Sequence, residues 1–229
     1  MHVPDGFLDG PTSVGTAAIA AAGIGVALWR SRSSLDDRTA PMAGMAAVFV
    51  FAAQMLNFPV GAGTSGHLLG GALAAVLVGP WTATLCITVV LVVQALLFAD
   101  GGITALGTNV TLMAVVGVWV GWALFRAVVL VLPRRTASVP IAAAVAAFVS
   151  VPVTALAFVG MYAVGGQAPI PLDTLTTAML SWHALIGIGE AVITFLVVGS
   201  ITTARPDLVR GAAGRRPADL VRREAEVPA

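Results

Sequence analysis

The apolar stretch Val139–Val164, VPIAAAVAAFVSVPVTALAFVGMYAV, decides the fold class of this chain because it contains no charged side chain. As an α-helix it is long enough to cross the ~30 Å hydrocarbon core of a bilayer. The whole chain of 229 residues has the same character, with 58% hydrophobic residues, 10% charged residues and a mean hydropathy of +0.96. Soluble domains carry about a quarter of charged residues. The sequence therefore predicts an all-α, polytopic protein embedded in a lipid bilayer.

Six further apolar runs flank this stretch. They extend over Thr12–Trp29, Pro41–Phe58, His67–Val78, Trp81–Ala99, Gly107–Val131 and Leu175–Thr203. A glycine-rich segment, Val60–Gly66, separates the second run from the third. Non-helical backbone is stable at membrane depth only where protein or a water-filled cavity covers it. The segment from Gly61 to Gly66 is therefore predicted to be a re-entrant lining of an internal site, with an ordinary external loop as the alternative.

The arginines predict how these runs are oriented. All twelve basic residues are arginines, and they form three clusters that follow or end the first, fifth and seventh runs. The clusters are Arg30, Arg32 and Arg38, then Arg126, Arg134 and Arg135, and then Arg205, Arg210, Arg215, Arg216, Arg222 and Arg223. With seven transmembrane helices and an outside N-terminus, all three clusters lie on the cytoplasmic side, as the positive-inside rule requires.

We therefore expect a multi-pass protein of the plasma (inner) membrane with a cytoplasmic C-terminus. Residues 1–203 are predicted to form the membrane domain, and residues 204–229 an Arg-rich cytoplasmic tail that is disordered. No basic segment precedes the first run, so no cleaved leader is expected, and the bulk of His2 is expected to keep Met1 in place.

Several classes of chemistry are excluded or disfavoured by residues that the sequence lacks. There is no lysine, so neither a P-loop nor a Schiff base is possible. The single cysteine, Cys86, rules out an internal disulfide and a thiolate cluster. No convergent catalytic set is visible, so an enzyme is disfavoured. Neither a resident cofactor nor a nucleic-acid partner is expected, and transport driven by ATP would need another subunit to hydrolyse it.

Met1 and His2 together offer three nitrogens to a metal ion. The terminal amine and the His2 amide nitrogen close a five-membered chelate ring, and the amide and Nδ1 of the same histidine close a six-membered one. A fourth nitrogen from His67 would complete a square plane, the geometry of nitrogen-rich Ni(II) and Cu(II) sites. Each histidine alone is more simply a chance residue or a core residue. The turn-prone Pro4–Gly6 and the glycines before His67 favour a shared metal site.

The stretches that carry these residues resemble the CbiM/NikM family. They are Met1-His2-Val3-Pro4-Asp5-Gly6-Phe7-Leu8, Asn57-Phe58-Pro59-Val60 and Thr64-Ser65-Gly66-His67-Leu68-Leu69-Gly70-Gly71. Members of this family are the substrate-binding membrane subunits of energy-coupling-factor importers for cobalt and nickel. The resemblance implies seven spans, an outside N-terminus and metal ligation by Met1, His2 and His67.

The same resemblance implies the transported ions and the partners. The chain would capture Co²⁺ or Ni²⁺ for separate ATP-binding subunits and a transmembrane coupling subunit, with a small accessory membrane subunit as a further candidate. The residues do not discriminate between the two metals, and family frequency favours cobalt for cobalamin biosynthesis.

Other polar residues are candidates for supporting roles. Asp5, Asn57, Thr64, Ser65 and Asn109 are predicted to orient the imidazoles by accepting their remaining N–H groups, although each could instead be a cap or a helix contact. Small side chains at Ala17, Ala18, Ala21 and Ala22 either pack inside the bundle or dock the coupling subunit.

His183 and Glu190 supply the alternative function. They lie two helical turns apart, on one face of the last predicted span. Such a pair is either structural, which we favour, or a proton relay of a stand-alone proton-coupled metal carrier.

Overall fold

The computed structural model of the chain describes residues 1–32, 39–61 and 64–215, without the side chains of residues 58–61 and 64–65. Its helices are α1 (Gly10–Ser31), α2 (Thr39–Gln54), α3 (Gly71–Val78), α4 (Pro80–Leu97), α5 (Leu106–Asn109), α6 (Val118–Val131), α7 (Ser138–Gly165) and α8 (Leu172–Ala204). A π-helical segment, Val110–Gly117, joins α5 to α6, and two short 3-10 helices follow α8 at Pro206–Leu208 and Arg210–Ala212. Strands β1 (Phe58–Gly61) and β2 (Thr64–Gly66) form an antiparallel hairpin.

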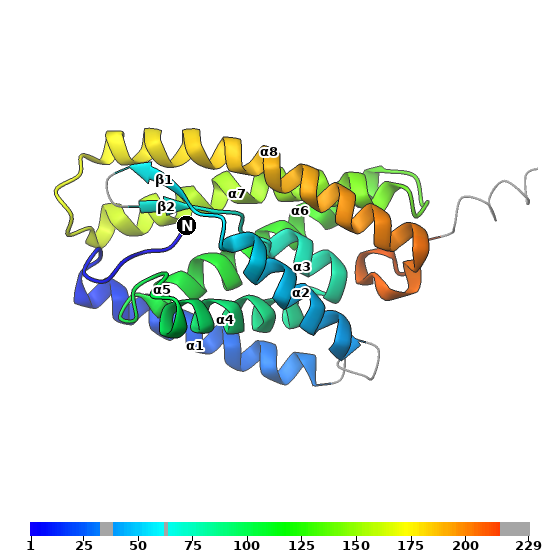
Figure 1. Cartoon of the computed structure of the whole chain (residues 1–229), viewed down its shortest axis with the longest axis horizontal. Coiled ribbons are helices and arrows are strands. Elements are labelled where there is room, and N and C mark those ends of the chain that lie inside the picture. The colour runs from blue at the N-terminus through cyan, green and yellow to red at the C-terminus, as the bar shows by residue number, and fades with distance from the viewer. Residues whose placement is uncertain (33–38, 62–63, 216–229) are drawn as a thin grey trace, which may run out of the picture.

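The helical membrane architecture predicted from the apolar runs is confirmed. Within the described residues, five helical segments are long and apolar enough to cross a membrane, namely α1, α4, α5–α6, α7 and α8. The second and third predicted spans correspond to the shorter helices α2 and α3. Helix α2 continues into β1, and β2 continues through His67 into α3. This non-helical backbone lies towards the end of the bundle that carries the N-terminal segment (Figure 1).

The hairpin differs from what the sequence predicted, since neither a re-entrant lining nor an external loop anticipates paired strands. Phe58 pairs with Gly66 and Pro59 with Ser65, and both strands contact α8. Pairing satisfies backbone groups that would otherwise be exposed to an apolar environment. The hairpin ends one residue before His67 and therefore helps to fix the position of this histidine.

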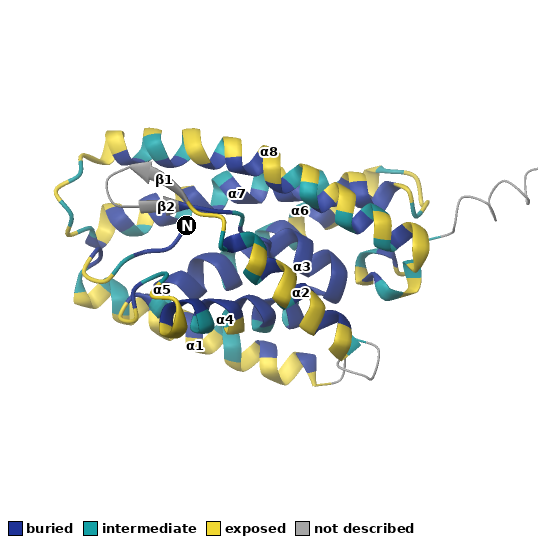
Figure 2. Cartoon of the chain, in the orientation of Figure 1, coloured by how far each residue is buried: buried dark blue, intermediate teal, exposed yellow. Residues whose placement is uncertain are grey.

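The short helix α3 lies at the centre of the bundle, and all eight of its residues are buried (Figure 2). It contacts α2, α4, α6, α7 and α8. Small residues allow this crowding, since a Cβ built on Gly121 of α6 would lie 2.8 Å from both Cα and Cβ of Ala72. A helix of eight residues is about 12 Å long, so α3 cannot span a bilayer and instead fixes the position of the His67 segment before it.

The predicted tail is packed against the bundle in its described part. Val209 and Ala212 are buried, and the guanidinium of Arg215 donates to the backbone carbonyls of Val129 and Pro133. Ordered structure therefore continues beyond residue 204, because apolar tail side chains find room beside α3 and α6. Residues 216–229 lie outside the described residues, and for them a disordered tail stays a prediction.

The described segments that carry arginines and those that carry Asp5, Asp100 and Asp173 lie at opposite ends of the bundle (Figure 1). The C-terminal end of α1, the α6–α7 connection and the described segment after α8 share one end, and they carry Arg30, Arg32, Arg134, Arg135, Arg205, Arg210 and Arg215. The N-terminal segment, the α4–α5 connection and the α7–α8 connection share the other end and carry Asp5, Asp100 and Asp173.

Candidate metal site

Residues 1–3 form the innermost part of the N-terminal segment. Met1, His2 and Val3 are 2%, 5% and 1% exposed, although no helix precedes them. The side chain of Asn109 pairs with Val3 as a neighbouring strand would. Its Oδ1 accepts from the Val3 N–H at 2.7 Å, and its Nδ2 donates to the Val3 carbonyl at 3.1 Å. The Gly102 N–H also donates to that carbonyl, at 3.0 Å. The backbone next to His2 is therefore held on both sides.

The rest of the N-terminal segment is fixed by two carboxylates. Asp5 accepts from the N–H and the hydroxyl of Thr104, at 2.8 and 2.5 Å. The Thr104 hydroxyl holds the pKa of Asp5 below its ordinary value. Asp9 caps α1 by accepting from the Thr12 N–H at 2.8 Å, and hydrogen bonds from Thr12 lower its pKa as well. Both carboxylates are therefore ionised at neutral pH, and the segment is anchored at each end of its turn.

Met1, His2 and His67 meet inside the bundle. The Met1 amine contacts Nε2 of His67, a residue with no exposed surface. The rings of His2 and His67 stack with centroids 4.4 Å apart and an interplanar angle of 30°. Nδ1 of His67 lies 2.7 Å from the Leu68 carbonyl, which as an acceptor requires the proton on Nδ1. The Nε2 lone pair therefore points at the amine of Met1.

Burial also favours the neutral forms of the N-terminal nitrogens. It lowers the pKa of the Met1 amine well below its ordinary value, and it lowers the pKa of the His2 imidazole. A neutral amine and a neutral imidazole are the forms that donate lone pairs to a metal. The segment thus presents its nitrogens in the state that coordination needs.

The His2 ring lies between two polar residues that the sequence analysis did not identify. Nε2 lies 3.2 Å from Oε1 of Gln94, and Nδ1 lies 3.0 Å from Oδ1 of Asp100. The second pair is within ion-pair distance. Sequence signals for both existed, since Gln94 is an amide within an apolar run and Asp100 begins the turn Asp100-Gly101-Gly102.

The described side chains among the predicted supporting residues bond to residues other than the two histidines. Asn57 donates to Oδ2 of Asp100 at 3.0 Å, Asn109 holds Val3, and Asp5 lies on the surface with Thr104. The side chains of Thr64 and Ser65 lie outside the described residues. The prediction that this group orients the imidazoles stays a prediction.

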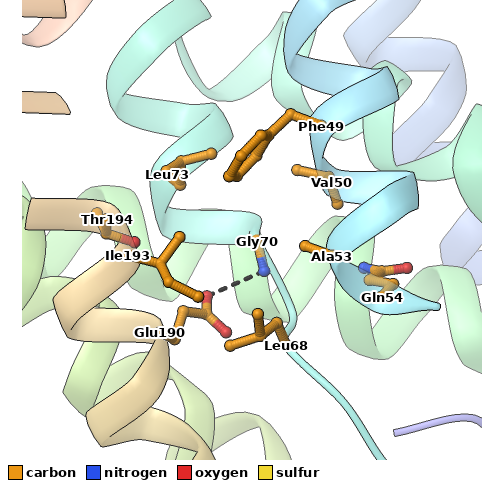
Figure 3. A pocket seen from close by; sticks show the side chains of 10 residues that line it. All are labelled: Phe49, Val50, Ala53, Gln54, Leu68, Gly70, Leu73, Glu190, Ile193 and Thr194. Carbon is orange, nitrogen blue, oxygen red and sulfur yellow. Dashed lines mark hydrogen bonds between the residues drawn. The ribbon is translucent and has the colours of Figure 1, made fainter. Parts of the chain in front are cut away.

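Glu190 fixes the segment that follows His67. Its Oε2 accepts from the Leu69 N–H at 2.6 Å, and its Oε1 accepts from the Gly70 N–H at 3.0 Å (Figure 3). Gln54 donates to the Leu69 carbonyl at 2.8 Å. Gly70 has φ +72°, and a Cβ there would lie 2.7 Å from Val50, so only glycine fits at this bend. These bonds favour a structural role for Glu190 over a proton relay.

His183 is fully buried on the same helix. Its Nδ1 lies 2.8 Å from the Met179 carbonyl. The bond to its own helix is what a structural histidine makes, and no contact joins it to Glu190 among the hydrogen bonds of the described residues.

Side chains alone do not make a metal site here. Within the described residues, no three His, Cys, Asp or Glu side chains cluster in a way that could hold a metal ion. Two imidazoles, a terminal amine and a backbone amide are the nitrogen donors that the arrangement offers. What the fold and this arrangement define is a helical, multi-pass membrane protein with an internal, nitrogen-rich site.

Comparison with known proteins identifies the family. The chain matches the CbiM model, cobalt uptake substrate-specific transmembrane region, over residues 2–208, and it belongs to this family. A Haloquadratum walsbyi protein named for metal transport is 42% identical over 91% of this chain and 93% of its own length. An Archaeoglobus fulgidus protein named for fused nickel transport is 40% identical over 93% of this chain and 69% of its own.

A solved structure resembles this chain in both fold and sequence. The crystal structure of a truncated transition metal transporter superimposes with a TM-score of 0.83 at 32% identity, covering 89% of this chain and 99% of the other. The chain is therefore a multi-pass membrane component of transition-metal uptake, and the family resemblance read from the sequence is confirmed.

Proposed function

We propose that this chain is the metal-capturing subunit of a multi-subunit importer for Co²⁺ or Ni²⁺. The ion binds to the Met1 amine, the amide nitrogen and Nδ1 of His2, and Nε2 of His67, in a square plane. The observation that carries this proposal is the contact between the Met1 amine and His67 Nε2 beside the stacked His2 ring. The printed names of the family and of a relative, cobalt uptake and nickel transport, support the choice of ions.

Binding follows from ordinary coordination chemistry. Two fused chelate rings hold three of the four donors, and the fourth donor comes from a segment already fixed by Glu190 and Gln54. The His2 amide releases its proton to the solvent as the metal binds, so affinity rises with pH. Four nitrogens in a plane suit Ni(II) and bind Cu(II) more tightly still, so supply of the ion must contribute to selectivity in the cell.

The ion enters from outside the cell in this proposal. Support comes from the arginine clusters, which lie at the opposite end of the bundle from the N-terminal segment. A separate transmembrane coupling subunit and ATP-binding subunits supply the energy, since this chain has no lysine for a phosphate loop. The exposed alanines of α1, Ala17, Ala18, Ala21 and Ala22, are the proposed docking face. Supply of cobalt for cobalamin biosynthesis is the proposed physiological role.

The decisive experiment changes the N-terminus itself. A Gly-Ser extension before Met1 converts the amine into an amide and is expected to abolish nickel and cobalt binding to the purified protein, measured by metal analysis. His67→Ala is expected to do the same, while the same dipeptide added after Ala229 leaves binding intact. Wild-type metal content in the N-terminally extended protein would overturn the proposed site.

A further inference from the structure

A cavity of about 290 Å³ lies beside the candidate metal site, at the end of the bundle that carries Asp5 and Asp100. Residues 99–102 line one side of it, and His2, Pro4 and Asp5 line the other. Asp5 and Ala99 are exposed, whereas His2 is buried. The cavity therefore leads from the surface to the His2 ring.

Asp100 and His2 both line this cavity and are in direct contact within it. Oδ1 of Asp100 lies 3.0 Å from Nδ1 of the buried His2 ring. Two donors that each lie about 2.1 Å from one metal ion, at a right angle, are about 3.0 Å apart. The pair is therefore spaced as neighbouring ligands of a single ion would be.

Asp100 is held in place while remaining accessible. Its Oδ2 accepts from Asn57, and its backbone N–H donates to the Gln94 carbonyl at 3.1 Å. Its side chain keeps 16% of its surface exposed, against 3% for His2. An ion arriving through the cavity meets this carboxylate before it reaches the imidazole.

We propose that the cavity is the metal entrance and that Asp100 is the first ligand, taking a hydrated divalent cation from solvent and passing it to Nδ1 of His2. A carboxylate oxygen replaces one water of the hydrated ion, and the imidazole nitrogen then replaces another. This inference rests on the proposed function, because it assumes that the nitrogens around His2 are the destination.

Size and charge agree with this role. Six waters at ~30 Å³ each occupy about 180 Å³, so a hydrated ion fits the cavity of about 290 Å³. The walls carry two carboxylates, Asp5 and Asp100, and no arginine. A recess lined by one sign of charge concentrates counter-ions and raises their association rate.

The test measures how fast nickel ions bind the full chain in nanodiscs. Asp100→Asn keeps the shape of the side chain and removes its charge. We expect it to lower the association rate constant by on the order of tenfold and to flatten its dependence on ionic strength. The dissociation rate and the absorption spectrum of the loaded protein stay as in the wild type. Asp173→Asn, an exposed change on α8 outside the cavity, is the matched control and binds at the wild-type rate.

Two results would contradict the proposal that Asp100 receives the ion in the metal entrance. One is wild-type association in the Asp100→Asn protein. The other is a faster dissociation with an altered spectrum, which would make Asp100 a partner that only orients His2. The wild type supplies a test that needs no variant, since an association rate independent of ionic strength also contradicts the proposal. Failure of the wild type to bind nickel or cobalt at all would instead overturn the proposed function.

Discussion

Asn109 is a side chain that holds the N-terminal peptide in position. It makes two hydrogen bonds with the backbone of Val3, the residue after the proposed chelate. Asn109→Ala removes both and is expected to weaken nickel binding by about 10–100-fold, the usual effect of losing a residue that orders metal ligands. Asn109→Asp keeps the acceptor for the Val3 N–H and should lose less. Isothermal titration of the two variants checks the order, and equal losses would contradict it.

The sequence predicted the proposed donors of this site but not their surroundings. Met1, His2 and His67 are recognisable because a terminal amine next to a histidine has a specific chelate chemistry. Gln94 and Asp100 were missed because they come close to His2 only in the folded chain. Gln94 reaches it from α4, and Asp100 from the turn that contains Ala99, with φ 51°, and Gly101, with φ +92°. A Cβ on Gly101 would lie 3.1 Å from both His2 Cδ2 and Asn109 Nδ2. Such proximity between residues about a hundred positions apart is a tertiary property.

Helix α8 contacts the segment after His67 through Glu190, whose carboxylate accepts hydrogen bonds from the N–H groups of Leu69 and Gly70. Glu190→Ala leaves the buried N–H groups of Leu69 and Gly70 without acceptors, at a cost of about 1–3 kcal/mol each. We expect a lower melting temperature together with weaker metal binding, because His67 loses its support. Glu190→Gln keeps one acceptor and should be intermediate in both measurements. Wild-type metal affinity in a destabilised Glu190→Ala protein would contradict the prediction that Glu190 supports metal binding.

Close packing between α3 and α6 depends on a small residue at the crossing. A methyl group on Gly121 would meet the backbone of Ala72 at 2.8 Å, so the two helices would have to separate. Gly121→Ala is therefore expected to lower the melting temperature in detergent, since overpacking a tight core costs about 1–3 kcal/mol. Gly160→Ala on α7, where nothing lies within 4 Å of an added Cβ, is the control and should be neutral or stabilising. Equal melting temperatures would contradict the packing argument.

At the same scale, helix existence was predictable and helix length was not. The apolar runs gave α1, α7 and α8 nearly to their ends, because most lipid-facing and most buried residues are apolar and the charged residues gather near the connections. The run His67–Val78 is helical only from Gly71, because Glu190 and Gln54 bind Leu69 and Gly70 at a bend where Gly70 is left-handed. Hydropathy does not register such hydrogen bonds, so the functional segment is where the prediction from apolar runs fails.

For the whole molecule, the orientation in the membrane is the property that links the site to uptake. The arginine-bearing end is expected in the cytoplasm, and the end that carries the N-terminal segment and Asp173 outside. Arg135 is an exposed residue of the arginine-bearing end, and Thr174 is an exposed residue of the opposite end. The single native cysteine, Cys86, is buried and can be replaced by alanine to give a background without thiols.

In that background, Thr174→Cys is expected to react with a membrane-impermeant maleimide in intact cells. Arg135→Cys is expected to react only after the cells are permeabilised, because the bilayer separates it from the reagent. Nickel uptake by both variants serves as the control for folding. The reverse pattern would place the His2 site on the cytoplasmic side, where a captured ion could not be an imported one. Orientation therefore decides whether the same four nitrogens serve capture from outside or retention inside.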